Sequence, residues 1–125
     1  MSLHNHINSF RQNLEKLQDY GYSESLEINE EIRANKQVVL TAFAILIDGS
    51  KFQIREYIDA RYKIEIVSYA YHFQDIRGQC IFRYDNAVHR PPLEFKEHKH
   101  KADGNIIKAS IPMISDLVDE IILHL

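Results

Sequence analysis

The residue types best suited to chemistry gather in one segment of the chain, residues 81–104. Three of the seven histidines lie there, His89, His98 and His100. His98 and His100 flank Lys99, so an extended backbone would turn both imidazoles to one side. Two such imidazoles can exchange protons near neutral pH or bind a zinc-like ion. Histidine-rich polar loops also occur without either role. The pattern therefore identifies candidate residues for proton transfer or metal binding, but it does not establish an activity.

Metal-free RNA cleavage is one reaction that these residue types would suit. It needs a base for the 2′-hydroxyl, an acid for the leaving 5′-oxygen and a cation for the phosphorane charge. Segment 81–104 contains all three types: Arg83, His89, Arg90, His98, Lys99 and His100. Five Arg or Lys and four Asp or Glu give the segment a charge of only +1, while the whole chain carries −3. Any contact with nucleic acid would therefore be local.

Strand-like alternation before the segment places further candidates on two faces. In residues 81–86, Arg83 and Asp85 share one face, and Tyr84 and Asn86 share the other. His72 lies opposite a row of aromatic residues that is typical of a core. A lone histidine on a strand is more often structural than catalytic, but His72 is a candidate for proton transfer.

Glu56 occupies an otherwise apolar face of its strand. Arg55 and Tyr57 share the opposite face. A carboxylate among apolar side chains is costly unless it is paired or hydrogen-bonded. Two interpretations remain open: a structural residue, at a strand edge or in a buried ion pair with Arg83, or a carboxylate held for acid–base or metal chemistry.

The elements expected to position these residues predict an α+β fold. Apolar residues at spacings of three and four predict a helix at 7–19 and another at 113–125. Between them, alternation and turn signals predict strands within 22–86, followed by a His/Arg-rich loop at 86–109. Short turns favour an antiparallel meander of about five strands, covered on one face by the two helices. We expect residues 1–125 to form a single domain.

Composition narrows the class of protein further. Hydrophobic residues make up 45% and charged residues 26%, as in globular domains. The longest uncharged apolar run, residues 38–47, is too short to cross a bilayer, and no signal peptide is evident. A single cysteine, Cys80, fits a reducing compartment. We therefore expect a cytoplasmic protein without a membrane segment. No nucleotide-binding or standard hydrolase motif is present.

Four short motifs occur in order along the chain: REY at 55–57, YHFQD at 71–75, IFRYDNAVH at 81–89 and HKH at 98–100. Together they resemble the TumE family, the toxin component of a prokaryotic toxin–antitoxin pair. The resemblance covers about residues 20–125. It implies a small cytoplasmic prokaryotic protein with a DNA-binding antitoxin as its partner. An RNA-directed activity is an inference from the toxin role.

The resemblance also indicates site residues, position by position. The matching positions are: Arg55, Glu56, Tyr57, His72, Asp75, Arg83, Tyr84, Asp85, Asn86, His89, His98 and His100. The chain departs from the family pattern at two places. Family members often have two histidines after the third motif and a proline before HKH, where this chain has His89-Arg90 and Glu97.

Three hypotheses follow from the residues and the resemblance. The first is a ribonuclease-like toxin with catalytic and substrate-binding side chains and no required cofactor. The second is a protein-binding module without chemistry, and the third is a structural histidine cluster in which His98 and His100 bind a divalent metal ion. A homodimer through an edge strand is a further possibility. In the first hypothesis the catalytic candidates are His98, His100, His72 and Glu56. The substrate-binding candidates are Arg83, Arg55, Tyr57, Tyr84, Asp85, Asn86, His89 and Lys99, with Tyr84 or Tyr71 stacking on a base.

Overall fold

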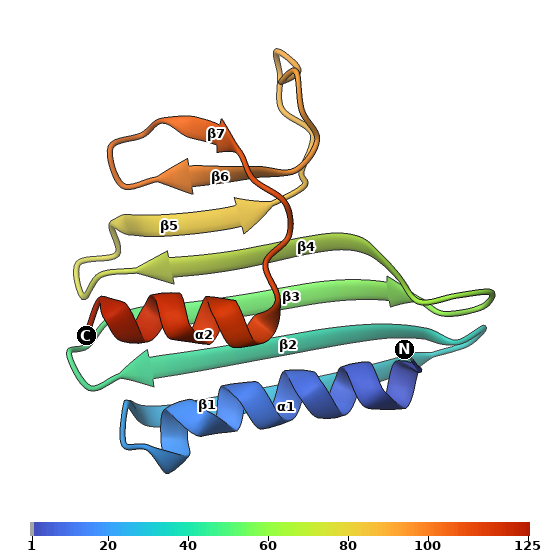
Figure 1. Cartoon of the computed structure of the whole chain (residues 1–125), viewed down its shortest axis with the longest axis horizontal. Coiled ribbons are helices and arrows are strands. Elements are labelled where there is room, and N and C mark those ends of the chain that lie inside the picture. Colours follow the sequence, from blue (N-terminus) through green and yellow to red (C-terminus); the bar gives the residue numbers. More distant parts are fainter. Residues whose placement is uncertain (1) are drawn as a thin grey trace.

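The computed structural model describes residues 2–125, and within them the chain forms two helices and seven strands (Figure 1). The elements follow in this order: α1 (Leu3–Asp19), β1 (Ser23–Arg33), β2 (Gln37–Leu46), β3 (Lys51–Asp59), β4 (Glu65–Gln74), β5 (Cys80–Asp85), β6 (His98–Lys101), β7 (Ile106–Lys108) and α2 (Ile114–Leu123). The fold is α+β, as the sequence predicts.

All seven strands form one sheet in chain order, and each is antiparallel to the next. The predicted meander is therefore confirmed, but the strands number seven rather than about five. The two additional strands, β6 and β7, lie inside the segment 86–109 that was predicted to be a loop. They were missed because β6 is only four polar residues and β7 only three, too short for alternation to be evident. The long loop that remains spans 86–97.

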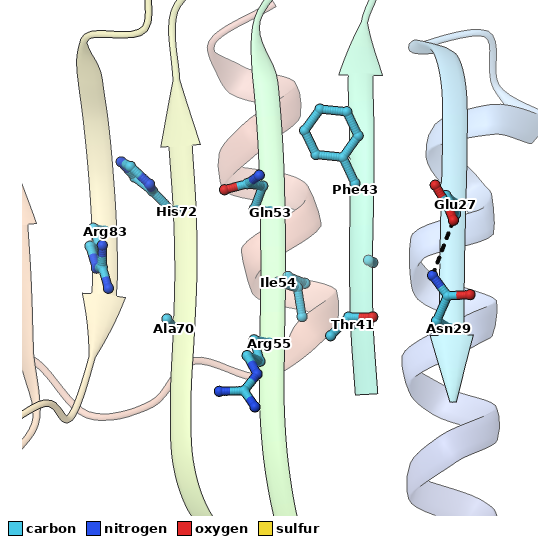
Figure 2. Close-up of a pocket in the computed structure, with 11 residues that line it drawn as sticks. Glu27, Asn29, Thr41, Phe43, Gln53, Ile54, Arg55, Ala70, His72 and Arg83 are labelled. Carbon is cyan, nitrogen blue, oxygen red and sulfur yellow. Dashed lines mark hydrogen bonds between the residues drawn. The ribbon is translucent and has the colours of Figure 1, made fainter. Parts of the chain in front are cut away.

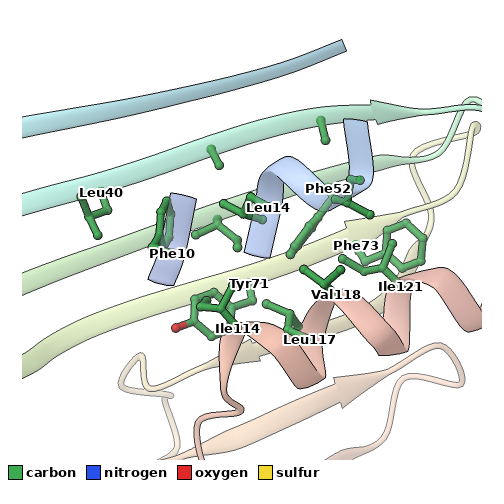
Figure 3. Close-up of a cluster of buried hydrophobic side chains, with 14 of the residues drawn as sticks. Phe10, Leu14, Leu40, Phe52, Tyr71, Phe73, Ile114, Leu117, Val118 and Ile121 are labelled. Atoms are coloured by element: carbon green, nitrogen blue, oxygen red, sulfur yellow. The ribbon is translucent and has the colours of Figure 1, made fainter. Parts of the chain in front are cut away.

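Both helices pack on the same face of the sheet (Figure 1). Phe10 and Leu14 of α1 and Leu117 and Ile121 of α2 are buried there, one helical turn apart within each helix. Figure 3 shows these side chains meeting apolar residues of the sheet, such as Phe52. Helix α1 begins at Leu3, one turn before the predicted start, because the Ser2 hydroxyl caps it by accepting the Asn5 N–H.

The opposite face of the sheet carries no helix within residues 2–125 (Figures 1 and 2). Residues on β3 alternate between buried and exposed, which separates the core face from this uncovered face. The uncovered face is therefore where polar side chains can meet solvent and ligands. Neither helix of residues 2–125 is long and apolar enough to cross a membrane.

Candidate active site on the uncovered face of the sheet

The register of the strands β3–β6 brings four predicted residues together on the uncovered face. His72 on β4 lies opposite Arg83 on β5, and Arg83 lies opposite His100 on β6. Arg55 on β3 lies opposite Ala70, one step along the same face from His72. Cross-strand partners project from the same side of a sheet, so His72, Arg83 and His100 are aligned across three strands, with Arg55 one step away on the fourth. We call these four residues the row. Figure 2 shows His72 between Gln53 and Arg83, Arg55 next along β3 near Ala70, and the helices behind the sheet.

One carboxylate and three imidazoles form a compact group at the end of this row. We call it the His–Asp cluster, and its members are Asp85, His89, His98 and His100. Asp85 and His98 are buried cross-strand partners, and an Asp85 oxygen contacts His98 Nε2. His89 Nε2 lies 2.9 Å from His98 Nε2, and His100 Nε2 lies 3.5 Å from Asp85 Oδ2. The cluster thus joins the ends of β5 and β6 to the loop 86–97.

Neighbouring groups hold the cluster in place. Arg83 Nε donates a hydrogen bond of 2.7 Å to Asp85 Oδ2, and the Ala87 N–H donates one of 3.2 Å to Asp85 Oδ1. On the other side, the Nδ1 of His98 lies 3.0 Å from the carbonyl oxygen of Lys96. A carbonyl oxygen only accepts, so His98 Nδ1 carries a hydrogen and donates it. These contacts fix both the carboxylate and the orientation of the His98 ring.

The environment lowers the pKa of the two histidines in the row. For His72, burial lowers the pKa, and the charges of Arg83 and His100 lower it further. For His100, burial also lowers the pKa, although the Asp85 carboxylate acts in the opposite direction. Both side chains are only partly buried. At neutral pH both are therefore mainly uncharged, the state in which an imidazole can accept a proton.

Two adjoining open clefts follow the row. One, of about 400 Å³, is lined by Arg55, His72 and Arg83 together with Phe43 of β2 (Figure 2). The other, of about 450 Å³, is lined by His72, Arg83 and two members of the His–Asp cluster, His89 and His100. His72 and Arg83 belong to both. A third cleft beside them, of about 420 Å³, is lined by Arg55, Arg83 and Asp85, so Arg83 marks the centre of the hollowed surface.

Glu56 does not join this site. It is fully buried on the helix-covered face, where its carboxylate accepts hydrogen bonds from the Tyr71 hydroxyl at 2.6 Å and from His6 Nε2 at 2.7 Å. The ion pair with Arg83 considered from the sequence does not form, because Arg83 is on the other face and binds Asp85. Burial raises the pKa of Tyr71, and the charge of Glu56 raises it further.

Two more substrate-binding candidates also lie on the helix-covered face. Tyr84 and Lys99 both bind the Glu120 carboxylate of α2, each at 2.7 Å. Tyr71, suggested for stacking on a base, is only 1% exposed. None of these three side chains lines the clefts at the row. Their contacts instead connect the sheet to α2 and fill the core.

The remaining candidates occupy the margins of the site. Tyr57 is on the uncovered face, where its hydroxyl donates to Gln37 on β2. The Asn86 side chain binds the backbone of β4, accepting the Tyr69 N–H at 3.1 Å and donating to the Val67 carbonyl at 3.1 Å. Asn86 therefore holds the end of β4 beside the cluster.

Sequence reasoning missed some residues that define the site. Phe43 belongs to the uncharged apolar run 38–47, yet it lines the cleft beside Gln53 and His72 (Figure 2). Alternation along β2 could have identified it, since Phe43 faces away from Leu40 and Ala42. His6, the partner of Glu56, gave no local signal because the two residues are 50 positions apart.

Comparison with known proteins gives one match. The family model described as "Toxin TumE" matches residues 13–124, nearly the whole chain. No curated protein and no solved structure matches.

Proposed function

The chain belongs to the TumE family of toxins, and from this membership we propose that it is the toxin of a toxin–antitoxin pair and cleaves RNA on the uncovered sheet face. The toxin family implies an antitoxin partner. That the antitoxin binds DNA, and that the pair acts in a prokaryotic cytoplasm, are parts of the same proposal.

One observation carries the proposal: two guanidinium groups and two imidazoles lie in one row across an open face. Arg83 is partly exposed, and Arg55 is exposed and forms no salt bridge with an acidic side chain of residues 2–125. Guanidinium groups bind phosphate oxygens well, because their planar N–H donors match the geometry of the phosphate. The row can therefore hold a phosphodiester against His72 and His100.

The roles follow from exposure and position. Arg55 and Arg83 bind the phosphate and stabilise the charge that develops on it. His72 and His100 are partly exposed and mainly neutral at pH 7, so they are the candidates for proton transfer. His98 is fully buried and cannot reach an RNA backbone, so we assign it to positioning Asp85. Phe43, at the edge of the row, offers a ring on which a base can stack.

The local arrangement also explains how an acidic chain could bind RNA. The net charge is −3, but among residues 2–125 a single acidic side chain, Glu27 at the β1 edge of the sheet, lines the cleft that contains Arg55, His72 and Arg83. Association would depend on a few charge-assisted contacts at the row rather than on a broad basic surface. Single-stranded RNA, with accessible bases and a flexible backbone, fits such a surface best.

The test is induced expression in bacteria together with cleavage of single-stranded RNA by the purified chain. We expect wild type to arrest growth and cleave RNA, and His72→Gln to cleave about 100-fold or more slowly. Arg55→Gln should weaken cleavage about tenfold or more. His4→Gln and Arg61→Gln are matched controls, because both side chains are exposed and distant from the row.

Different outcomes separate the hypotheses. Growth arrest without loss of RNA would overturn the cleavage proposal and favour the protein-binding module. Equal cleavage by wild type and the folded His72→Gln variant would remove His72 from the mechanism. Absence of growth arrest by the wild-type chain would contradict the toxin role itself. Circular dichroism spectra of each variant show whether a loss of activity reflects unfolding.

A further inference from the structure

At the centre of the His–Asp cluster, one ring nitrogen, Nε2 of His98, has two close neighbours. His98 Nδ1 already donates its hydrogen to the Lys96 carbonyl, so only Nε2 faces the cluster. That one atom lies 2.9 Å from His89 Nε2 and in contact with an Asp85 oxygen. A single N–H at this atom can point well at only one of these two neighbours. A cation at the centre would satisfy all of them at once.

We propose that the cluster binds one divalent transition-metal ion through four side chains: Asp85, His89, His98 and His100. Imidazole and carboxylate are the ligand types that zinc and its neighbours prefer in proteins. The four donor atoms all lie within 4.8 Å of one another. Tetrahedral bonds of about 2.0–2.1 Å would place ligand atoms roughly 3.3 Å apart. Separations of 2.9 and 3.5 Å in the cluster lie on either side of that value, whereas His98 Nε2 and the Asp85 oxygen, 2.5 Å apart, would have to separate slightly to admit the ion.

The surroundings resemble the outer shell of a metal site. A metal-bound histidine commonly donates its second ring N–H to a backbone carbonyl, as His98 does to Lys96. A ligating carboxylate is commonly hydrogen-bonded as well, and Asp85 accepts from Arg83 and from the Ala87 backbone. These contacts orient His98 Nε2 and the carboxylate toward the same point before any ion arrives.

Because of where the four ligands lie, binding of an ion would have two effects. Three ligands come from the paired strands β5 and β6, whereas His89 comes from the loop 86–97. A bound ion would therefore fasten the loop to the sheet. His89 and His100 also line the open cleft, so the ion would lie beside the phosphate-binding row and could act there as a Lewis acid. His72 would then be the one imidazole of the row left free for proton transfer.

Metal binding can be measured without RNA, so this proposal stands or fails separately from the proposed cleavage. The full-length chain is stripped with a chelator and titrated with Co²⁺ as a spectroscopic probe, and Zn²⁺ is then added to displace it. We expect one ion per chain and the visible absorption of tetrahedral cobalt, lost on addition of Zn²⁺. Calorimetry with Zn²⁺ alone measures the affinity directly.

The variants locate the site. His89→Gln and His100→Gln each remove one partly exposed ligand, and we expect each to weaken Zn²⁺ binding about tenfold or more. His72→Gln is the matched control, since it changes a histidine of the same cleft that is outside the four ligands, and it should keep wild-type affinity. His98 is left unchanged because its full burial makes unfolding a competing explanation.

Proteolysis provides a second measurement that involves no cobalt spectrum. Zn²⁺ should slow cleavage within the loop 86–97 of wild type several-fold and leave the His89→Gln loop unprotected. Three results would overturn the proposal: no saturable binding by wild type, equal loss of affinity in His72→Gln and His100→Gln, or one-to-one binding unchanged in both ligand variants. The first would leave the cluster a hydrogen-bonded network, and the other two would place the ion elsewhere.

Discussion

Replacing Glu56 tests whether this buried carboxylate supports the fold or the chemistry. It is 0% exposed and lies between the sheet and the start of α1, bonded to Tyr71 and His6. We expect Glu56→Ala to destabilise the chain strongly, because it leaves a buried hydroxyl and an imidazole without their acceptor. The proposed cleft on the opposite face should keep its arrangement for as long as the chain is folded.

The expected magnitude follows from the two contacts. A hydrogen bond to a charged group contributes about 1.5–3 kcal/mol, and removing one partner of a buried pair costs about 3–5 kcal/mol. The loss for Glu56→Ala should therefore be about 3–5 kcal/mol. With an unfolding entropy of about 2.1 cal/mol/K per residue, that loss lowers Tm by roughly 10–20 °C for a chain of this length. Tyr71→Phe removes only one contact and should cost about 1–2 kcal/mol.

Urea and thermal unfolding followed by circular dichroism measure these differences. Glu65→Ala is the control, because Glu65 is an exposed carboxylate on the neighbouring strand β4, and its replacement should change stability by less than about 0.5 kcal/mol. The reasoning is refuted if Glu56→Ala is as stable as Glu65→Ala. If that stable variant also failed to arrest growth, Glu56 would act in catalysis, the alternative that the sequence left open.

Two further predictions concern stability. Gly49→Ala should destabilise the chain by about 1.5–3 kcal/mol, because its φ is +83° and an added Cβ, 2.5 Å from Ile76 Cδ1, would force that exposed side chain to turn away. Gly78→Ala, at the same φ but with open space around the Cβ, should cost only about 1–2 kcal/mol in the same urea titrations. Burial raises the pKa of Tyr71, so above the unfolded tyrosine pKa of about 10 the unfolded chain loses a proton that the folded chain keeps. The stability that Tyr71 contributes is thus present below pH 10 and is lost as the pH rises. Between pH 9 and pH 11, the free energy of unfolding of wild type should therefore fall more than that of Tyr71→Phe. An equal fall in both proteins would contradict this prediction.

The parts of the fold that the sequence predicts are those with long and regular patterns. The apolar stripe containing Phe10 and Leu14 predicts a helix with one buried face, and that face packs on the sheet. Alternation predicts that Arg83 and Asp85 share a face, and both project from the uncovered side. In each case the periodicity reports which side of an element is buried.

The parts that the sequence does not predict depend on contacts between distant positions. Strand β6 is polar throughout, so nothing in HKHK marks it as a strand, and its pairing with β5 stabilises it. Glu56 does not pair with Arg83, one of the alternatives that the sequence left open, but with Tyr71 and with His6, which the approach of α1 brings to it. Local pattern cannot specify such pairs, because they arise only when the elements pack.

The separation of the two faces has a consequence for the proposed site. The core residues and the contacts of Glu56 and Glu120 lie on the helix-covered face, so they supply most of the stabilisation. Arg55 and His72 lie on the uncovered face, where no helix depends on them for packing. Substituting them should therefore change binding and cleavage at little cost in stability. Asp85 and His98 differ, because they are buried on the uncovered side and support both the end of β5 and the cluster. Substitutions of Arg55 and His72 should therefore change function with little change in stability, whereas substitutions of Asp85 and His98 should change both.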